Sequence, residues 1–589
     1  MSDDTTSDSW GPARRGGAAS WISVLILFVA GVLLPLLVAA HYDALDIPRS
    51  DDWSYLVTLF RWVDHGRLGF NDWVSMTLVG QLVIAAPIVA VFGESIRAVH
   101  IFSAVLGFAG LLGLYAVGRQ VLPRGRGALL VAVTMAVGPL WAPLAATYMT
   151  DVPAFAAQML SLGVAISAVR RPRLALAKLA LALALGFVAI SIRQYEIIPV
   201  IATLLVAVWI AAHEPDRGRL RPVLAMAGAL VLAVVALLAW WSNLPDSLSL
   251  SPDPQTSGLV ANLIVQSAGF LRLTGLLLIP VVVWLDPMRI IRRAWNASRR
   301  LALATAAGAS TWLLVTYVRS PATPFVGNYV DRHGVLSEDV LNGRRPLVMP
   351  ARMFDLVVAA GSIAAVVLLL AMVEPTTRLI ASIRNRDRTL TDPGTAILAL
   401  TVAGFATAYA IAIATKLPIF DRYALPAIPL AGLLTIGTME RAGPEPVPIP
   451  PRSTPGWTRL VATAVVTVLF AGVGLVFATD SAAFDATRWK VDEAAVRHGY
   501  SPLAIYGGFE WISYHRRRGP ILGKSVAERQ RLRRIYFRGL CVDVVVNPRP
   551  RVARRAIARA TMGGIGHADV AIVAVPNSRR CAHGRPRPL

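Results

Sequence analysis

The run WISVLILFVAGVLLPLLVAA, residues 21–40, is followed by the acidic pair Asp51-Asp52. An apolar helix of ~20 residues is long enough to cross the hydrocarbon of a bilayer. Arg14 and Arg15 precede the run, and basic residues stay on the cytoplasmic side, so the run is predicted to cross outward. The acidic pair then lies on the outer face, next to the membrane. Carboxylates there do not help insertion, but they can take a proton from a hydroxyl group.

The composition places the whole chain in a membrane. Of its 589 residues, 55% are hydrophobic, and the mean hydropathy is +0.57. Soluble globular domains of ordinary composition do not reach these values. The formal net charge of +23 would suggest nucleic acid in a soluble protein, but the basic residues gather in short turns between apolar runs. Membrane topology explains that pattern, so we expect no nucleic-acid partner. The preference for arginine over lysine is typical of a GC-rich bacterial genome.

Thirteen apolar runs are predicted to cross the membrane. They cover residues 21–40, 97–118, 127–145, 152–169, 174–191, 197–212, 222–241, 262–285, 301–317, 353–373, 395–415, 423–439 and 460–478. Arginine-rich turns alternate with turns that carry acids, which places the amino terminus in the cytoplasm and the carboxyl terminus outside. We therefore predict a polytopic α-helical protein of the bacterial cytoplasmic membrane. It has a disordered cytoplasmic tail (1–20), a membrane module (21–479) and an outer domain (480–589).

Two long loops are predicted on the outer face. The first, residues 41–96, contains an apolar stretch at 76–92 that is interrupted by glycine, glutamine and proline. Counting this stretch as a span would invert every later turn, so we predict an interfacial or re-entrant helix. The aromatic residues of this loop are ordinary interfacial anchors. The second loop, residues 320–352, mixes charged residues with glycine and proline, as a mobile loop facing substrate would.

After residue 478 the composition becomes that of a soluble domain. Two runs rich in β-branched residues, 542–546 and 570–575, predict buried strands, and residues 525–538 predict a helix. A small α/β or α+β domain follows from this pattern. Both cysteines of the chain, Cys541 and Cys581, lie in it. Because the outer compartment is oxidising, we expect them to form a disulfide.

Four short motifs carry a resemblance to a known family. They are Asp-Asp-Trp-Ser-Tyr at 51–55, Thr-Asp-Val-Pro at 150–153, Asp-Arg-Tyr at 421–423 and Tyr-Gly-Gly-Phe-Glu-Trp at 506–511. Their order and predicted sidedness resemble the bacterial GT-C fold glycosyltransferases, in particular the branch of protein O-mannosyltransferases and lipid A aminoarabinose transferases. The resemblance covers nearly the whole chain. The family usually has Asp-Glu in the first outer loop, where this chain has Asp51-Asp52.

The resemblance implies transfer of a sugar from a polyprenyl-phosphate carrier to a hydroxyl acceptor, with inversion at the anomeric carbon. An acceptor on a protein, a lipid or a polysaccharide stays open, and so does the identity of the sugar. Nucleotide sugars are confined to the cytoplasm, so a transferase that faces outward needs a lipid-linked donor. Such a reaction requires a base for the acceptor proton and cations for the departing lipid phosphate.

Three acids are candidate catalytic residues. Asp51 occupies the position of the family's first acid and is the predicted base. Asp52 would orient Asp51 or the acceptor, and two adjacent carboxylates should raise the proton affinity of one of them. Asp151 begins the fourth span, where it either caps the helix or takes part in the reaction. For Asp51 and Asp52, the alternative is a solvated acid that only marks topology.

Three basic residues are candidates for binding the lipid phosphate: Arg193, Lys416 and Arg422. All three are predicted at outer ends of spans, where a lipid phosphate would lie. Arginine suits phosphate because its planar group donates two hydrogen bonds at once. The alternative is that these side chains only reach the lipid headgroups. Asp421 could serve as the structural partner of Arg422.

The sequence contains no legible metal site and implies no cofactor, although a divalent ion held by Asp51 or Asp151 stays open. A second functional class is a transporter or flippase of lipid-linked sugars, which should carry ionisable residues near the middle of several spans. The predicted span interiors are almost free of charge, and the acids gather at one face, so an enzyme is favoured. A non-catalytic scaffold of the cell envelope is the third reading.

Overall fold

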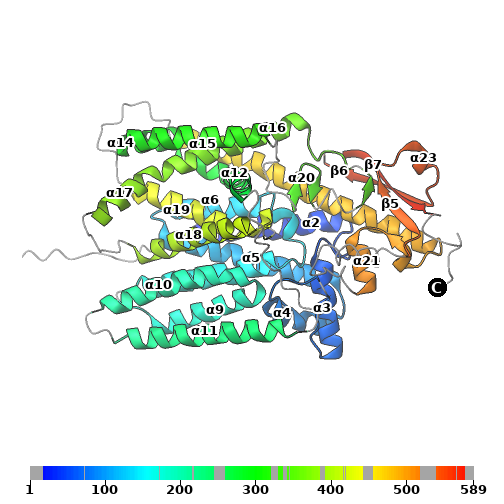
Figure 1. Ribbon diagram of the computed structural model, residues 1–589, viewed down its shortest axis with the longest axis horizontal. Coiled ribbons are helices and arrows are strands. Elements are labelled where there is room, and N and C mark those ends of the chain that lie inside the picture. Colours follow the sequence, from blue (N-terminus) through cyan, green and yellow to red (C-terminus); the bar gives the residue numbers. More distant parts are fainter. Residues whose placement is uncertain are drawn as a thin grey trace, which may run out of the picture.

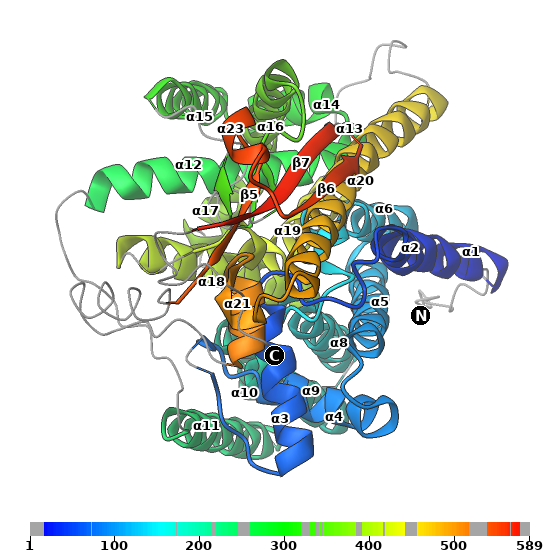
Figure 2. The same cartoon turned by 90° about the vertical axis from the view of Figure 1, so that its right-hand side faces the viewer.

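The computed structural model describes residues 17–577, apart from residues 72, 172, 215–217, 245–258, 320–328, 336–340, 344, 385–391, 416, 418, 442–455, 518–538 and 566. A bundle of long helices makes up most of the molecule, and a small mixed sheet lies at one end of it (Figure 1). We call this end the sheet end. Turned to face the viewer, the sheet end shows strands, α3 and α21 lying over the ends of the bundle helices (Figure 2).

The described helices follow one another along the chain in this order. In the first half they are α1 (Gly17–Phe28), the π-helical η1 (Val29–Leu33), α2 (Leu34–His41), α3 (Asp52–His65), α4 (Val79–Phe92), α5 (Ile96–Val121), α6 (Gly125–Ala136), α7 (Trp141–Leu144), α8 (Asp151–Val169), α9 (Leu176–Ile192), η2 (Gln194–Glu196), α10 (Ile197–His213) and α11 (Leu220–Ser242). In the second half they are α12 (Leu259–Leu277), α13 (Ile279–Leu285), α14 (Pro287–Ala297), α15 (Arg299–Arg319), α16 (Ala351–Ala371), α17 (Val373–Arg384), α18 (Pro393–Ala414), η3 (Asp421–Ala424), α19 (Ala427–Arg441), α20 (Gly456–Arg497), η4 (Pro502–Ala504), α21 (Phe509–Arg516) and α23 (Pro550–Ala553).

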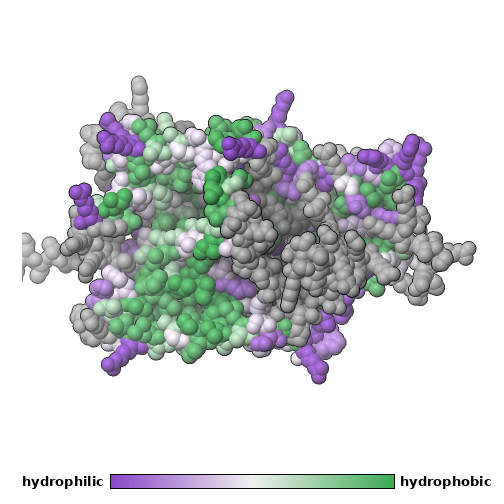
Figure 3. Space-filling view, in the orientation of Figure 1, coloured by the Kyte–Doolittle hydropathy of each residue, from purple (hydrophilic) through white to green (hydrophobic). Residues whose placement is uncertain are grey.

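Ten helices in the described residues are long and apolar enough to cross a membrane. They confirm the prediction of a polytopic helical membrane protein, and on the face seen in Figure 3 apolar side chains gather over the middle of the bundle, with hydrophilic residues toward both ends. The other three predicted spans are shorter helices, α6, α9 and α19. The span predicted at 127–145 is wrong as a single helix, because α6 ends at Ala136 and α7 begins only at Trp141. Gly138 and Pro139 lie in the break, and proline cannot continue a helix.

Small residues allow the central helices α5 and α8 to pack closely. A Cβ atom on Gly110 would lie 2.9 Å from the Cα atom of Ala156, and one on Gly113 would lie 3.0 Å from the backbone of Met159. A larger side chain at Gly110 would force the backbone of α8 to shift, and one at Gly113 would require α8 to give by a few tenths of an ångström. In a membrane, where lipid is as apolar as leucine, such close backbone approach is a main source of helix association.

The sheet combines strands from two parts of the chain. Its strands are β3 (Asn342–Gly343), β4 (Ile505–Tyr506), β5 (Val542–Val546), β6 (Ala558–Gly564) and β7 (His567–Pro576). The strand β5 pairs antiparallel with β7, which pairs antiparallel with β6, while β3 and β4 both pair parallel with β5. The two predicted strands are confirmed as β5 and part of β7, and the predicted helix at 525–538 lies outside the described residues. A separate hairpin joins β1 (Val330–Asp331) and β2 (Gly334–Val335).

The helix α20 connects the bundle to the sheet. It has 42 residues and continues unbroken through residue 478, where the composition changes. The sequence contains no glycine or proline between Gly474 and Gly499, so nothing stops the helix there. It ends beside Gly499, whose φ of 88° is in the left-handed region. Alanine and aromatic residues of its second half pack against the buried face of β5.

Candidate active site

Asp51 lies in the turn that joins the first span to α3. Its Oδ1 accepts a hydrogen bond from Trp73 Nε1 at 3.0 Å, and its Oδ2 accepts one from Arg422 Nη2 at 2.9 Å. The side chain is 15% exposed. Asp51 is therefore an oriented carboxylate that solvent and a substrate hydroxyl can still reach.

Asp52 points the opposite way and is completely buried. Its Oδ1 accepts the backbone N–H of Arg49 at 2.5 Å, and its Oδ2 contacts His100 Nε2 at 2.9 Å and the backbone N–H of Tyr148 at 3.3 Å. Burial raises the pKa of Asp52, while the contacts with His100 oppose that rise. Burial, and not the adjacent carboxylate that the sequence suggests, is the main cause of this rise. Asp52 therefore holds the turn and is not accessible to solvent.

Asp151 begins α8, and it pairs with an arginine from the end of α9. Arg193 Nη2 lies 2.8 Å from Asp151 Oδ2, and Arg422 Nε lies 4.0 Å from the same oxygen. Among the described residues, Oδ1 of Asp151 has no hydrogen-bond partner, so the side chain does not cap the helix through that atom. Arg193 also donates to Thr150 Oγ1 at 2.6 Å and to the hydroxyl of Tyr195 at 2.7 Å.

Arg422 brings the two acids together. Its side chain is 3% exposed, with Nη2 on Asp51 and Nε near Asp151. Within the described part of the chain, Nη1 and Nε make no hydrogen bond. The guanidinium lies 5.2 to 5.8 Å from the ring centres of three aromatic residues, Tyr329, Phe420 and Tyr423. A buried arginine with unused donors is suited to an anionic group that is not part of the protein.

Asp421 supports the backbone at this position and does not pair with the guanidinium of Arg422. Its Oδ1 accepts the N–H of Arg422, and its Oδ2 accepts the N–H of Val330, both at 2.8 Å. Burial raises the pKa of Asp421 to about 7, while these backbone N–H groups pull the pKa down. The residue thus ties the Arg422 segment to the hairpin β1–β2.

A cavity of about 480 Å³ adjoins this cluster. Arg193, Tyr195 and Tyr423 line its polar side. The remaining wall is mostly apolar and comes from the first loop and from helices α10, α11 and α18. It consists of Ser75, Met76, Gln194, Ile198, Trp241, Phe405, Ala408, Tyr409, Ala412, Leu417 and Ile419. The cavity can therefore take a ligand with one anionic group and a large apolar or ring-shaped part.

The structure brings Asp51, Asp151, Arg193 and Arg422 together, and it places Asp52 behind them. Lys416 and Cys581 lie outside the described residues, so the phosphate contact of Lys416 and the disulfide from Cys541 stay predictions. In the described residues, no group of three or more histidines, cysteines or acids is placed to hold a metal ion.

Sequence reasoning missed four contacts of this site: Trp73, Arg49, His100 and Tyr148. Trp73 was classed as an interfacial anchor, although its indole N–H binds Asp51. His100 carries a signal that could have been used, because it is a titratable residue inside an otherwise apolar run. Tyr148 contributes its backbone N–H, which no residue pattern reveals.

Comparisons with known proteins agree with the resemblance stated above. Residues 77–241, which include Asp151 and Arg193, match the family model described as dolichyl-phosphate-mannose-protein mannosyltransferase. No curated protein matches the chain. The match bears out the resemblance over these residues, in which the chain is similar to this family.

Two solved structures are similar over most of the chain. One is ArnT from Cupriavidus metallidurans bound to undecaprenyl phosphate, with 13% identity, a TM-score of 0.42, and coverage of 95% of this chain and 98% of that one. The other is the archaeal oligosaccharyltransferase AglB from Archaeoglobus fulgidus, in complex with an inhibitory peptide and a dolichol-phosphate. It has 13% identity, a TM-score of 0.43, and coverage of 90% of this chain and 69% of that one.

Proposed function

We propose that the protein transfers a sugar from a polyprenyl-phosphate carrier to a hydroxyl group, with inversion, on the outer face of a bacterial cytoplasmic membrane. The arrangement of Asp51 and Arg422 carries this proposal. A reachable carboxylate lies 2.9 Å from a buried arginine that has unused donors, beside a cavity with apolar walls. This combination provides a base for an acceptor and a site for an anionic, lipid-linked donor.

Arg193 and Arg422 would bind the phosphate of the donor. Two guanidinium groups near one phosphate offset its charge, and because both arginines are buried such contacts are strong. The apolar and aromatic wall of the cavity would hold the sugar or the first isoprene units. Asp51 and Asp151 both face arginines, an arrangement that suits a phosphate better than a metal cation.

Asp51 would act as the base. The acceptor hydroxyl gives its proton to Asp51 as its oxygen attacks the anomeric carbon, and the bond from that carbon to the phosphate oxygen breaks. The lipid phosphate leaves with the electron pair, next to the two arginines. Because the attack and departure occur on opposite sides of the carbon, this single displacement inverts the anomeric centre. The donor phosphate would also compete with Asp51 for Arg422, which would free the carboxylate to contact the acceptor hydroxyl.

The test replaces Asp51 with asparagine, which keeps the shape and removes the basicity. A strain lacking the gene identifies the envelope glycan that depends on it, and the purified variant is added to membrane vesicles of that strain, which hold the native donor and acceptor. We expect transfer to fall ~100- to 10,000-fold, with binding of undecaprenyl phosphate in detergent retained.

Asp46→Asn is the matched control, since Asp46 is an exposed acid of the same loop that pairs with Arg97. It should leave the rate unchanged. Transfer by Asp51→Asn at nearly the wild-type rate would rule out Asp51 as the base and direct attention to Asp151.

A further inference from the structure

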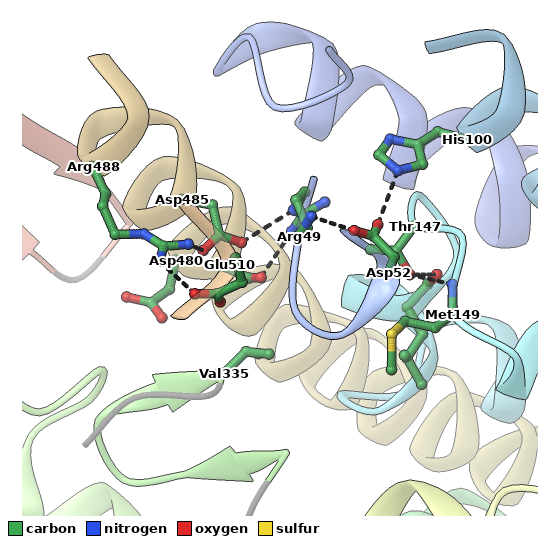
Figure 4. Close-up of polar contacts among 12 residues, drawn as sticks. Arg49, Asp52, His100, Thr147, Met149, Val335, Asp480, Asp485, Arg488 and Glu510 are labelled. Carbon is green, nitrogen blue, oxygen red and sulfur yellow. Dashed lines mark hydrogen bonds and ion pairs between the residues drawn. The ribbon is translucent and has the colours of Figure 1, made fainter. Parts of the chain in front are cut away.

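We propose that Arg49 is a positioning residue that fixes the Asp51 turn to helix α20, so that the domain at the sheet end holds the catalytic carboxylate in place. This inference rests on the proposed function, because it assumes that Asp51 reacts. Figure 4 shows Arg49 between Asp52 on one side and Asp485 on the other.

The turn itself requires outside support. Ser50, between Arg49 and Asp51, has a φ of 60°. This left-handed conformation is uncommon for residues other than glycine and persists where the surroundings enforce it. The backbone N–H of Arg49 closes the turn by binding Asp52, and Asp52 is held in turn by His100.

The side chain of Arg49 makes the connection to α20. Its Nε lies 3.2 Å from Asp485 Oδ2, and its Nη2 donates to Ser481 Oγ at 2.7 Å. The guanidinium is buried. Its two partners, Ser481 and Asp485, lie on neighbouring turns of one face of α20. Because a planar arginine group donates to both partners at once, it fixes the direction of the side chain as well as its distance.

The connection continues beyond α20 into α21. Oδ1 of Asp485 accepts from Arg488 Nη2 at 3.1 Å, and Arg488 Nη1 lies 2.6 Å from Glu510 Oε2. This series of ion pairs links the Asp51 turn, through α20, to α21 at the sheet end. It also makes Arg49 testable: if Arg49 is replaced, Asp485 keeps Arg488 as a partner, so no unpaired carboxylate is left behind.

Arg49 touches neither the cavity nor the unused donors of Arg422, so its effect on the reaction would be through geometry. Misplacing a reacting group by 1 Å can cost ~100-fold in rate. The expected result for Arg49→Gln is therefore a 10- to 100-fold lower maximal transfer rate in the vesicle assay, with the affinity for undecaprenyl phosphate unchanged. Arg49→Lys, which keeps the charge but cannot bind both partners, should recover only part of the rate.

Asp485→Asn tests the connection from its other end. If Arg49 acts through Asp485, the rate loss of the double variant Arg49→Gln/Asp485→Asn should be clearly smaller than the product of the two single losses. Lys490→Gln is the control, because Lys490 makes an exposed ion pair between the same helix and Asp43. It should leave both rate and affinity as they are.

Three results would overturn the proposal. The first is a wild-type transfer rate in Arg49→Gln. The second is a rate loss in the double variant that equals the product of the two single losses. The third is an equal loss of donor affinity and transfer rate, which would indicate general damage to the fold. If Arg49→Gln does not insert into the membrane, the transfer rates and donor affinities of Arg49→Lys and Asp485→Asn test the proposal instead. Failure of the proposed function is recognised separately, by full activity in Asp51→Asn.

Discussion

Two adjacent aspartates have opposite environments in this protein. The side chain of Asp51 is 15% exposed and faces arginine, whereas that of Asp52 is fully buried and faces histidine and backbone N–H groups. The sequence identified both as candidates because acids beside a membrane are unusual. It could not divide their roles, since the division depends on residues distant in sequence, His100 and Arg422.

Asp52→Asn should therefore affect folding more than chemistry. An asparagine amide would place N–H groups against the N–H donors that the carboxylate now accepts, at a cost of ~1–3 kcal/mol. We expect a lower thermal unfolding midpoint in detergent and a smaller loss of transfer per folded molecule than in Asp51→Asn. A loss as large as that of Asp51→Asn in a variant of normal stability would contradict this division of roles.

Arg422→Ala should lower both donor affinity and turnover, because a phosphate contact acts in the bound state and in the transition state. Losing hydrogen bonds to a charged group corresponds to roughly 10- to 100-fold in affinity for undecaprenyl phosphate. Arg61→Ala, which removes an exposed arginine at the same end of the molecule, is the control. Unchanged donor binding in Arg422→Ala would remove Arg422 from the phosphate site.

At the scale of elements, hydropathy predicted where helices lie but not where they stop. The broken segment at Gly138 and Pro139 was read as one span because its overall composition is apolar. Conversely, the composition changes after residue 478 while α20 continues to Arg497. The sequence of this stretch contains a signal for the longer helix, because no glycine or proline interrupts it, whereas the change in composition indicates only a change of environment. The strand β3 joins the sheet from position 342, which local patterns cannot indicate.

The packing of α21 on α20 should depend on pH through Glu510. Burial raises the pKa of Glu510 from its usual 4.5 to about 7, although Arg488 opposes the rise. The folded state thus keeps a proton that the unfolded chain releases above pH 4.5, so this contribution to stability is greatest at low pH and is lost as the pH rises to about 7. Between pH 4.5 and about 7, the thermal unfolding midpoint of the wild type should fall relative to that of Glu510→Gln, and above this window the two midpoints should run parallel. A constant difference across the window would contradict the prediction.

At the scale of the whole molecule, the candidate site and the sheet lie at the same end of the bundle (Figures 1 and 2). The alternation of basic and acidic turns predicted this shared side. It could not predict which helices surround the cavity, because that depends on packing between α10, α11 and α18. The sidedness relative to the cell is open to direct measurement.

Cysteines introduced at Asp46 and Arg549, both exposed positions, should react with a membrane-impermeant maleimide added to intact cells. A cysteine at Arg300, in a predicted cytoplasmic turn, should react only after the membrane is opened. The labelling is compared with that of the parent chain, which contains Cys541 and Cys581. Labelling of positions 46 and 549 from opposite sides would refute the thirteen-span topology.

The unbroken course of α20 has a mechanical consequence. At 1.5 Å per residue its 42 residues extend about 63 Å, roughly twice the thickness of the hydrocarbon layer. Helices adapt to thicker or thinner bilayers by tilting. A helix of this length, anchored in lipid at one end and joined to Arg49 further along, would convert such a tilt into a displacement of the Asp51 carboxylate. The acyl-chain length of the surrounding lipids would then help to set the rate of the proposed transfer.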